Sequence, residues 1–329
     1  MNIAILGAGG WGTTLAIHLH RKNYQIRLWE VFPEYASLLQ RERKNPKFLP
    51  GVSIPEKILI SSDLEKVIFK AELIILVVPS FAAREVLHRL KKFNLAKTII
   101  LSATKGMELN TNYRISEIIK EELGKKVKWA VLSGPTIARE VMEGKPSTAV
   151  VASPRAEIAR LAQRVLADKN LRIYTSSDPV GVELGGCLKN IIAIAAGIAD
   201  GLGFGANTKA ALLTRGLAEI SAFGQKMGAK SSTFTGLSGL GDLATTCISK
   251  NSRNRNFGEA IGKGKKMKKL LKETEMVIEG VNATEVVYHL AQKLMVEVPI
   301  TNSVYQILFE DKNPLIAVGE LMSRKEKTE

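Results

Sequence analysis

Short apolar runs alternate with helix-length amphipathic segments through the first half of the chain, and this alternation limits the possible folds more than any other feature. Candidate strands cover residues 2–6, 25–29, 57–61, 73–79, 97–103, 128–134, 148–153 and 171–175. Helical segments separate most of them, at residues 12–22, 62–71, 81–92, 113–123 and 155–168. Because strands that are apolar throughout must be covered on both faces, the pattern predicts a doubly wound α/β domain with a mainly parallel sheet.

The pattern changes after about residue 180, where strand-like runs disappear and long helical periodicity takes over. Glycine clusters and the segment NSRNRNFG at residues 251–258 interrupt this periodicity. We therefore predict an α/β domain over residues 1–182, followed by an all-α domain over residues 183–329.

The formal net charge of +15 raises the question of a nucleic-acid partner, since basic patches attract phosphate backbones. One dense block, KGKKMKKLLK at residues 263–272, holds six lysines and no acid. Aromatic residues are sparse, however, and no nucleic-acid-binding motif is present. We expect the block to be a solvated helix face and the protein to bind no nucleic acid. The positive field would still attract a small anionic substrate.

The two cysteines, Cys187 and Cys247, lie in apolar surroundings without the spacing of metal ligands. We therefore expect reduced thiols and no metal. The longest apolar run, at residues 191–199, is too short to cross a bilayer, and no charged-then-apolar leader precedes the first predicted strand. A cytoplasmic protein without a membrane span is the expectation.

The segment ILGAGGWG places Gly7, Gly9 and Gly12 in the G-x-G-x-x-G spacing between the first strand and the first helix. In that position the glycines allow a tight turn, a close approach of the backbone to a pyrophosphate, and close packing of helix against strand. The helix N-terminus then offers N–H groups to the anion. A Rossmann-type dinucleotide site is predicted, although glycines that serve only a turn would give the same spacing.

Glu30 ends the second predicted strand, eighteen residues after Gly12. A carboxylate there can accept hydrogen bonds from an adenosine ribose and would repel a 2′-phosphate. Val31 and Phe32 follow it and supply no cation, so the sequence favours NADH, unless the basic segment at residues 41–44 folds back over the site. The alternative is that Glu30 faces solvent.

Lys189 lies in the apolar run LGGCLKNIIAIAAGIADGLGFG, where an ammonium group is costly to desolvate. It is either a lysine whose head reaches water or one placed in a dry cleft to handle a proton. Two further sets of cations stand out: Lys105 follows a predicted strand closely, and Arg253 lies between the polar side chains of Ser252 and Asn254, as in a phosphate site.

The motifs GAGGWGTTLA, FLPG, VVPS, ATKG, SGPTIARE, residues 185–219, GLGDLATTC, SRNRNFG and VIEG follow one another through nearly the whole chain. In this combination the sequence resembles the bacterial-type NAD(P)-dependent sn-glycerol-3-phosphate dehydrogenases, over roughly residues 1–310. The resemblance implies reversible hydride transfer between NAD(P)H and dihydroxyacetone phosphate, giving sn-glycerol 3-phosphate for glycerophospholipid synthesis. It also implies a homodimer, with a dinucleotide-binding first domain and a second domain for substrate and dimerisation.

The resemblance assigns catalysis to Lys189, Lys105 and Asp242. Substrate contacts are expected at Lys105, Gly134, Thr136, Lys189, Asn190, Asp242, Thr246, Ser252, Arg253 and Asn254. Cofactor contacts are expected at Gly7, Gly9, Gly10, Trp11, Gly12, Glu30, Val31, Phe48, Lys105, Ala138, Arg253, Val277 and Glu279. Burial and Lys105 should lower the pKa of Lys189, while Asp242 limits the drop.

Two positions depart from the family pattern. Basic residues commonly follow the second strand, where this chain has Glu30, Val31 and Phe32, and Phe48 replaces a frequent tyrosine. The first departure puts NADPH use in doubt. Two other functions stay open: another two-domain hydroxyacid dehydrogenase of the same architecture, and a basic NAD-sensing or nucleic-acid-binding protein.

Overall fold

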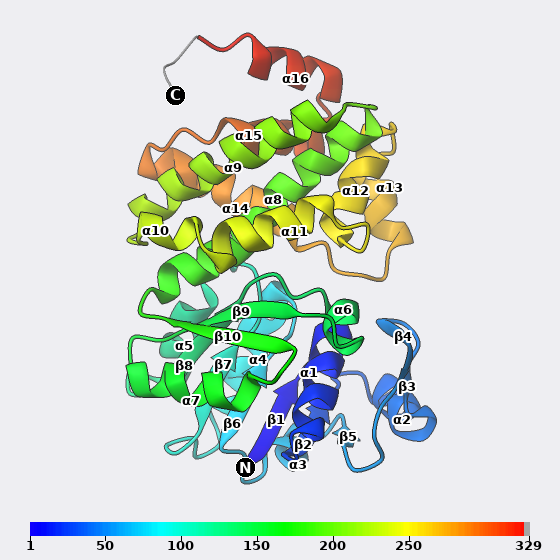
Figure 1. Cartoon of the computed structure of the whole chain (residues 1–329), viewed down its shortest axis with the longest axis vertical. Helices are drawn as coiled ribbons and strands as arrows, with labels where there is room; N and C mark the ends of the chain where they lie inside the picture. The colour runs from blue at the N-terminus through cyan, green and yellow to red at the C-terminus, as the bar shows by residue number, and fades with distance from the viewer. Residues whose placement is uncertain (326–329) are drawn as a thin grey trace. The chain divides into compact units, whose positions relative to one another are not determined.

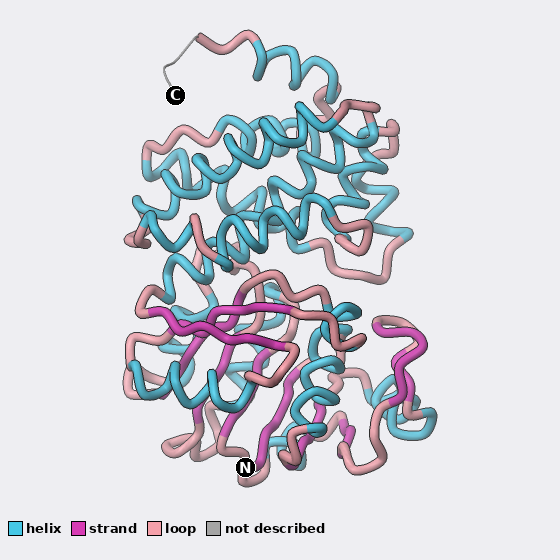
Figure 2. Tube along the Cα trace, viewed as in Figure 1, coloured by secondary structure: helices cyan, strands magenta, loops and turns pink. Residues whose placement is uncertain are grey.

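The computed structural model describes residues 1–325, and these divide into two compact units (Figures 1 and 2). The first unit comprises Met1–Thr104 and Tyr113–Pro179, and the second comprises Lys105–Asn112 and the chain from Val180 onward. The domain boundary after residue 182 stays a prediction. The short segment Lys105–Asn112 packs with the helical unit, although it follows a strand of the α/β unit.

The first unit is built on an eight-stranded sheet with the order β10-β9-β8-β7-β6-β1-β2-β5. The strands are β1 (Asn2–Leu6), β2 (Gln25–Trp29), β5 (Leu59–Ser61), β6 (Leu73–Leu76), β7 (Ile99–Ser102), β8 (Lys128–Ser133), β9 (Ser147–Ala152) and β10 (Leu171–Ser176). All neighbours pair in parallel except β8 and β9, which are antiparallel. The strand order reverses between β1 and β6, and in open α/β sheets this is where ligands bind, at the carboxyl ends of the strands.

Helices cover both faces of this sheet (Figure 1). They are α1 (Gly10–Arg21), α2 (Pro33–Glu42), α3 (Leu64–Ile68), α4 (Ala83–Leu90), α5 (Ile115–Leu123), α6 (Ala138–Met142) and α7 (Ala156–Leu166), with a 3₁₀ turn η1 (Ser80–Ala82) before α4. Strands β6 and β7 are buried at every residue, which explains why they read as uninterrupted apolar runs. The predicted doubly wound fold is confirmed.

A two-stranded hairpin beside the glycine turn was not predicted. It pairs β3 (Lys44–Asn45) with β4 (Leu49–Ser53). These strands are short and mostly exposed, so they lack the apolar alternation by which a strand is recognised in sequence.

The second unit is helical, as predicted. Its elements are α8 (Pro179–Gly201), α9 (Ala206–Lys226), α10 (Ser231–Phe234), a π-helical turn η2 (Leu237–Gly241), α11 (Asp242–Ile248), α12 (Arg253–Gly262), α13 (Met267–Glu273), α14 (Glu279–Leu294), α15 (Pro299–Phe309) and α16 (Pro314–Met322). One expectation holds only in part: residues 251 and 252 of the polar segment lie in the break between α11 and α12, whereas residues 253–258 already form the start of α12. The residues of this segment form the cap and the first turn of the helix, so the segment shows no apolar repeat in the sequence. The Ser252 hydroxyl caps the helix by accepting a hydrogen bond from the Arg255 N–H at 3.2 Å.

Helix α8 is the centre of this unit. It is long and apolar enough to cross a membrane by length and composition, but 94% of its most apolar window is buried inside the protein. Helix α12 crosses it so closely that a Cβ at Gly197 would lie 1.9 Å from the Arg255 carbonyl oxygen, and one at Gly258 would lie 2.1 Å from the Ile194 oxygen. Only glycines permit this approach, and it brings the start of α12 alongside α8.

Candidate functional site

The glycine turn of the first unit has the geometry of a phosphate-binding loop. Gly7 has φ of 116°, and a Cβ on it would lie 2.7 Å from the Val77 carbonyl oxygen. A Cβ on Gly12 would lie 1.9 Å from the Gly7 oxygen. The turn between β1 and α1 therefore requires glycine at both positions.

The N-terminus of α1 is open. Gly9 is its N-cap and has no side chain to accept hydrogen bonds from the first turn. A Cβ on Gly9 would meet nothing within 4 Å, whereas one on Gly10 would lie 2.7 Å from the Phe48 oxygen and 3.9 Å from the Ala138 Cβ. The structure thus brings Gly10, Phe48 and Ala138 together, and half-buried Trp11 packs on the core nearby. Free space beside unpaired N–H groups fits a pyrophosphate.

Glu30 ends β2 and is only 6% exposed, so the alternative that it faces solvent is wrong. Its carboxylate accepts a hydrogen bond from the Phe32 N–H at 3.1 Å. Burial raises the pKa of Glu30, and the backbone N–H groups of Phe32, Val31 and Ala8, together with the charge of Lys47, act in the opposite direction. Val31 and Phe32 themselves are exposed. The carboxylate is thus held at the edge of the glycine turn.

Both arginines of the basic segment at residues 41–44 make contacts with other groups than Glu30. Arg43 donates a hydrogen bond from Nη1 to the Ile58 carbonyl oxygen at 2.7 Å, and Arg41 pairs with Glu42. Lys47, in the loop of the unpredicted hairpin, acts on Glu30 electrostatically. Sequence reasoning missed Lys47 because its approach depends on how the hairpin folds.

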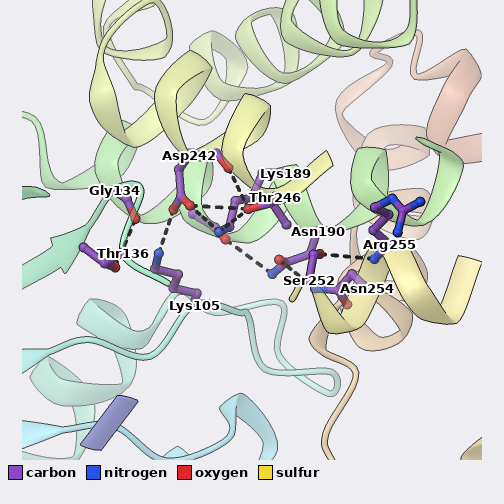
Figure 3. Close-up of polar contacts among 11 residues, drawn as sticks. Lys105, Gly134, Thr136, Lys189, Asn190, Asp242, Thr246, Ser252, Asn254 and Arg255 are labelled. Atoms are coloured by element: carbon purple, nitrogen blue, oxygen red, sulfur yellow. Dashed lines mark hydrogen bonds and ion pairs between the residues drawn. The ribbon is translucent and has the colours of Figure 1, made fainter. Parts of the chain in front are cut away.

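Gly134 and Thr136 follow β8. Gly134 has φ of 138°, and a Cβ there would lie 2.8 Å from the Ala149 Cα, so glycine is required. The Thr136 hydroxyl donates to the Gly134 carbonyl oxygen at 3.2 Å (Figure 3). This turn stands at the carboxyl end of a central strand, as expected for a ligand-binding loop.

In the second unit, Lys189, Lys105, Asp242 and Thr246 form one polar cluster (Figure 3). The Lys189 ammonium donates to Asp242 Oδ1 and, at 2.8 Å, to the Thr246 hydroxyl. The Lys105 ammonium donates to Asp242 Oδ2 at 2.7 Å. Lys189 is 7% exposed and Asp242 2%, so the alternative in which the Lys189 head reaches bulk water is wrong.

The charges of this cluster shift one another. Burial lowers the pKa of Lys189 to about 8, Lys105 adds to the lowering, and Asp242 opposes both, as predicted. For Asp242, burial favours the neutral acid, but Lys105 and Lys189 together bring its pKa below the ordinary value. Two ammonium groups and one carboxylate leave an excess positive charge that suits a developing oxyanion.

Local structure explains how these side chains meet. Asp242 begins α11, and Thr246 lies one turn later on the same face, where its hydroxyl donates to the Asp242 carbonyl oxygen at 2.6 Å. A Cβ on Gly185 would lie 2.3 Å from the Ser238 oxygen, so the glycine lets η2 approach α8 and places Asp242 against Lys189.

The three residues predicted to bind the phosphate, Ser252, Arg253 and Asn254, make different contacts in the structure. Ser252 caps α12, and Asn254 donates from Nδ2 to the Asn190 Oδ1 at 2.9 Å while accepting from the Gly280 N–H at 2.9 Å. Arg253, the first residue of α12, is exposed, and within residues 1–325 it makes no hydrogen bond or ion pair. Arg255 is engaged by Asp200 through Nη2 at 2.7 Å. The charge of Glu279 acts on the Arg253 guanidinium, but no hydrogen bond from the described part of the chain holds it, so at this helix N-terminus it suits an anion.

The remaining predicted cofactor contacts lie near this set. Val277 is half-buried. Glu279 begins α14 and precedes Gly280, whose N–H donates a hydrogen bond to Asn254. Cys187 and Cys247 are buried free thiols, and burial raises the pKa of both, that of Cys247 to about 12. Within residues 1–325, no group of three His, Cys, Asp or Glu side chains could hold a metal ion.

Comparison with known proteins gives consistent matches over the whole chain. A family model described as the NAD-dependent glycerol-3-phosphate dehydrogenase N-terminus matches residues 2–159, and its C-terminal counterpart matches residues 178–319. The glycerol-3-phosphate dehydrogenase [NAD(P)+] of a Thermoanaerobacter species is 48% identical over 100% of this chain and 99% of its own length. That of Chlorobium phaeobacteroides is 45% identical over the same shares. A crystal structure of glycerol-3-phosphate dehydrogenase from Coxiella burnetii has a TM-score of 0.95 at 42% identity, covering 98% of each chain.

Proposed function

The chain belongs to the NAD-dependent glycerol-3-phosphate dehydrogenase family, and on that premise we propose that it reduces dihydroxyacetone phosphate to sn-glycerol 3-phosphate, reversibly, with NAD(P)H. The observation that carries the proposal is the buried Lys189 ammonium, held between Asp242 and Thr246 in a cluster with excess positive charge. Such a group can protonate the oxygen of a reduced ketone.

The glycine turn and the start of α1 would hold the cofactor pyrophosphate, with Gly10, Phe48 and Ala138 beside it and Glu30 at the ribose. When bound, the nicotinamide supplies the hydride that reaches the ketone carbon. We propose Trp11, Val31, Lys105, Arg253, Val277 and Glu279 as further cofactor contacts, on the strength of the family resemblance.

During reduction, the carbonyl oxygen of the substrate gains negative charge, and the Lys189 and Lys105 ammonium groups stabilise it. The Lys189 Nζ then gives its proton to that oxygen. With a pKa of about 8, Lys189 is a stronger acid than an ordinary lysine, and once neutral it can accept the hydroxyl proton in the reverse direction. Asp242 orients the ammonium and keeps it charged near neutral pH.

We assign the substrate phosphate to Arg253 and the start of α12. The guanidinium there makes no hydrogen bond within the described residues, and its planar fork matches phosphate oxygens. Asn254 and Asn190 hold each other beside it and offer amide donors for the substrate. Gly134 and Thr136 are proposed as further substrate contacts.

We also propose that residues 1–182 serve the dinucleotide and residues 183–329 the substrate and dimer contacts. The enzyme acts, in this proposal, as a homodimer in the cytoplasm. The resemblance to the family supports these assignments. Light scattering coupled to size-exclusion chromatography tests the dimer directly, since a monomer at enzymatic concentrations would contradict it.

The proposed reaction is tested by following oxidation of NADH and NADPH side by side in the presence of dihydroxyacetone phosphate. Unphosphorylated dihydroxyacetone is the matched control, because it keeps the ketone and lacks the group assigned to Arg253. We expect turnover with the phosphate ester and far less with dihydroxyacetone. Equal rates with both substrates would contradict the phosphate assignment, and no turnover with either would contradict the reaction.

A further inference from the structure

The buried side chain of Asn45 joins four parts of the first unit around the glycine turn. Asn45 is 1% exposed and lies in the unpredicted hairpin, at the end of β3. Its Nδ2 donates to the Ala8 carbonyl oxygen at 2.7 Å and to the Thr13 hydroxyl at 2.7 Å. Its Oδ1 accepts from the Phe48 N–H at 3.1 Å and from the Tyr35 hydroxyl at 2.7 Å. Both donors and both acceptors of the carboxamide are therefore used.

The bond to Ala8 fixes the orientation of one peptide group. Because a trans peptide is planar, the Ala8 carbonyl and the Gly9 N–H point in opposite directions. The Thr13 hydroxyl donates to the same carbonyl at 3.3 Å, so two donors hold it on the side of Asn45. The Gly9 N–H then points to the other side, at the residue where a Cβ would meet nothing within 4 Å.

The bond to Phe48 acts on the same place. The Phe48 carbonyl oxygen lies 2.7 Å from the position of a Cβ on Gly10, at the first residue of α1. Asn45 thus sets both the peptide that faces the predicted pyrophosphate position and the loop that borders it. Neither effect is a contact with the ligand, so the role is positional.

We propose that Asn45 is a positioning residue for the cofactor: its carboxamide aims the Gly9 N–H at the pyrophosphate and holds Phe48 beside α1. This inference rests on the proposed function, because it requires the glycine turn to bind a nicotinamide dinucleotide. The hairpin then supports the phosphate loop through a side chain, that of Asn45, which carries no charge.

The test compares Asn45→Asp with Tyr35→Phe. The first change keeps the shape and the oxygen acceptors but removes both N–H donors and directs a carboxylate oxygen at the Ala8 carbonyl. The matched control removes a bond of the same length, 2.7 Å, on the opposite side of the same carboxamide. The dissociation constant for NADH is measured by fluorescence titration without substrate, and hydrogen exchange of the glycine turn is measured in cofactor-free protein.

We expect Asn45→Asp to weaken NADH binding about 10- to 100-fold and to speed exchange in the peptide containing Gly9, and Tyr35→Phe to change binding less than about threefold. The affinity of Asn45→Asp should recover partly as the pH is lowered, because a protonated carboxyl regains one donor. At saturating NADH the KM for dihydroxyacetone phosphate should stay near that of the wild type. If Asn45→Asp does not fold, Thr13→Val removes the second donor to Ala8 and should weaken NADH binding about 3- to 10-fold.

Three results would overturn the inference. One is an Asn45→Asp protein that binds NADH within threefold of wild type while its Tm falls, which makes Asn45 a purely structural residue. Another is equal weakening by Tyr35→Phe, which places the effect in the hairpin as a whole. The third is a wild-type protein that binds neither NADH nor NADPH, and this result alone also removes the proposed function.

Discussion

The glycine turn of the first unit and the Lys189 cluster of the second are built from different chemical groups, backbone in the first and charged side chains in the second. The turn presents backbone N–H groups, and its shape depends on residues without side chains, with Gly7, Gly9 and Gly12 within one short stretch. The cluster consists of charged side chains far apart in the chain: Lys189 lies 53 residues from Asp242, and Lys105 lies 137 residues from it.

The difference follows from what each region must do. A bound dinucleotide keeps its pyrophosphate charge throughout, so fixed backbone dipoles suffice and no group has to change its protonation state. Reduction of a ketone creates charge and requires a proton at one atom, so an ionisable group with a shifted pKa is needed. If the two regions work independently, a change in the Lys189 cluster should alter proton transfer and leave cofactor binding nearly intact.

The largest effect is expected for Lys189→Met, which keeps much of the side-chain volume and removes the ammonium. We expect kcat to fall about 10²- to 10⁴-fold, because proton donation and charge stabilisation are both lost. The dissociation constant for NADH, measured by fluorescence titration, should change little. A variant with more than a tenth of wild-type kcat would remove Lys189 from the proposed chemistry, and a large loss of NADH affinity would break the contrast between the two regions.

Asp242→Asn should lower kcat about 10²- to 10³-fold, since the two ammonium groups lose the carboxylate that orients them. Because Asp242 raises the pKa of Lys189, its removal should lower that pKa further below about 8. The protonated acid then disappears at lower pH, so the high-pH decline of the reduction rate should shift toward neutrality. The pH profile of kcat checks this. An unshifted decline would show that another group supplies the proton.

Arg253→Ala should raise the KM for dihydroxyacetone phosphate about 10- to 150-fold, the range expected for a lost charge-assisted hydrogen bond. Arg253→Lys should also raise this KM, though less than Arg253→Ala does, because an ammonium keeps the charge but cannot form the planar fork. Arg255→Ala is the matched control on the same helix: it breaks the ion pair with Asp200 and should lower Tm while leaving this KM nearly unchanged. Should the two variants affect KM equally, the phosphate does not bind at Arg253.

The smallest effect concerns the cofactor. We expect kcat/KM to favour NADH over NADPH by about tenfold, because the 2′-phosphate would meet the buried Glu30 carboxylate. The double variant Glu30→Ala, Val31→Arg should have a higher kcat/KM with NADPH and a lower one with NADH than the wild type. Lys47→Gln should widen the wild-type preference, since Lys47 is a cation near Glu30. Equal or better use of NADPH by the wild type would contradict the preference, and loss of that use in Lys47→Gln would then assign the 2′-phosphate to Lys47.

Much of this molecule is determined locally, and the sequence alone reveals that part. The eight strands of the sheet and the helices between them are recognisable from apolar runs and amphipathic segments, and the runs are uninterrupted where, as in β6 and β7, both faces are buried. The glycine turn is largely local, because Gly12 meets Gly7 and Ile5, and its spacing is sufficient to predict it, although Gly7 also meets Val77 from a distant part of the chain. The resemblance to a family added the identities of Lys189, Asp242 and Arg253, which no local pattern singles out as a set.

Only the tertiary structure decided the rest. Whether Lys189 reaches water depends on Asp242 and Thr246, which α11 brings to it only because Gly185 lets η2 approach α8. The same holds for Asn45 and Lys47, which lie in a hairpin too short and too exposed to leave an apolar pattern. Local sequence encodes backbone shape and burial through short-range sterics and periodicity, whereas a pKa or a hydrogen-bond partner depends on atoms that distant segments contribute, and their positions are fixed only when the whole core packs.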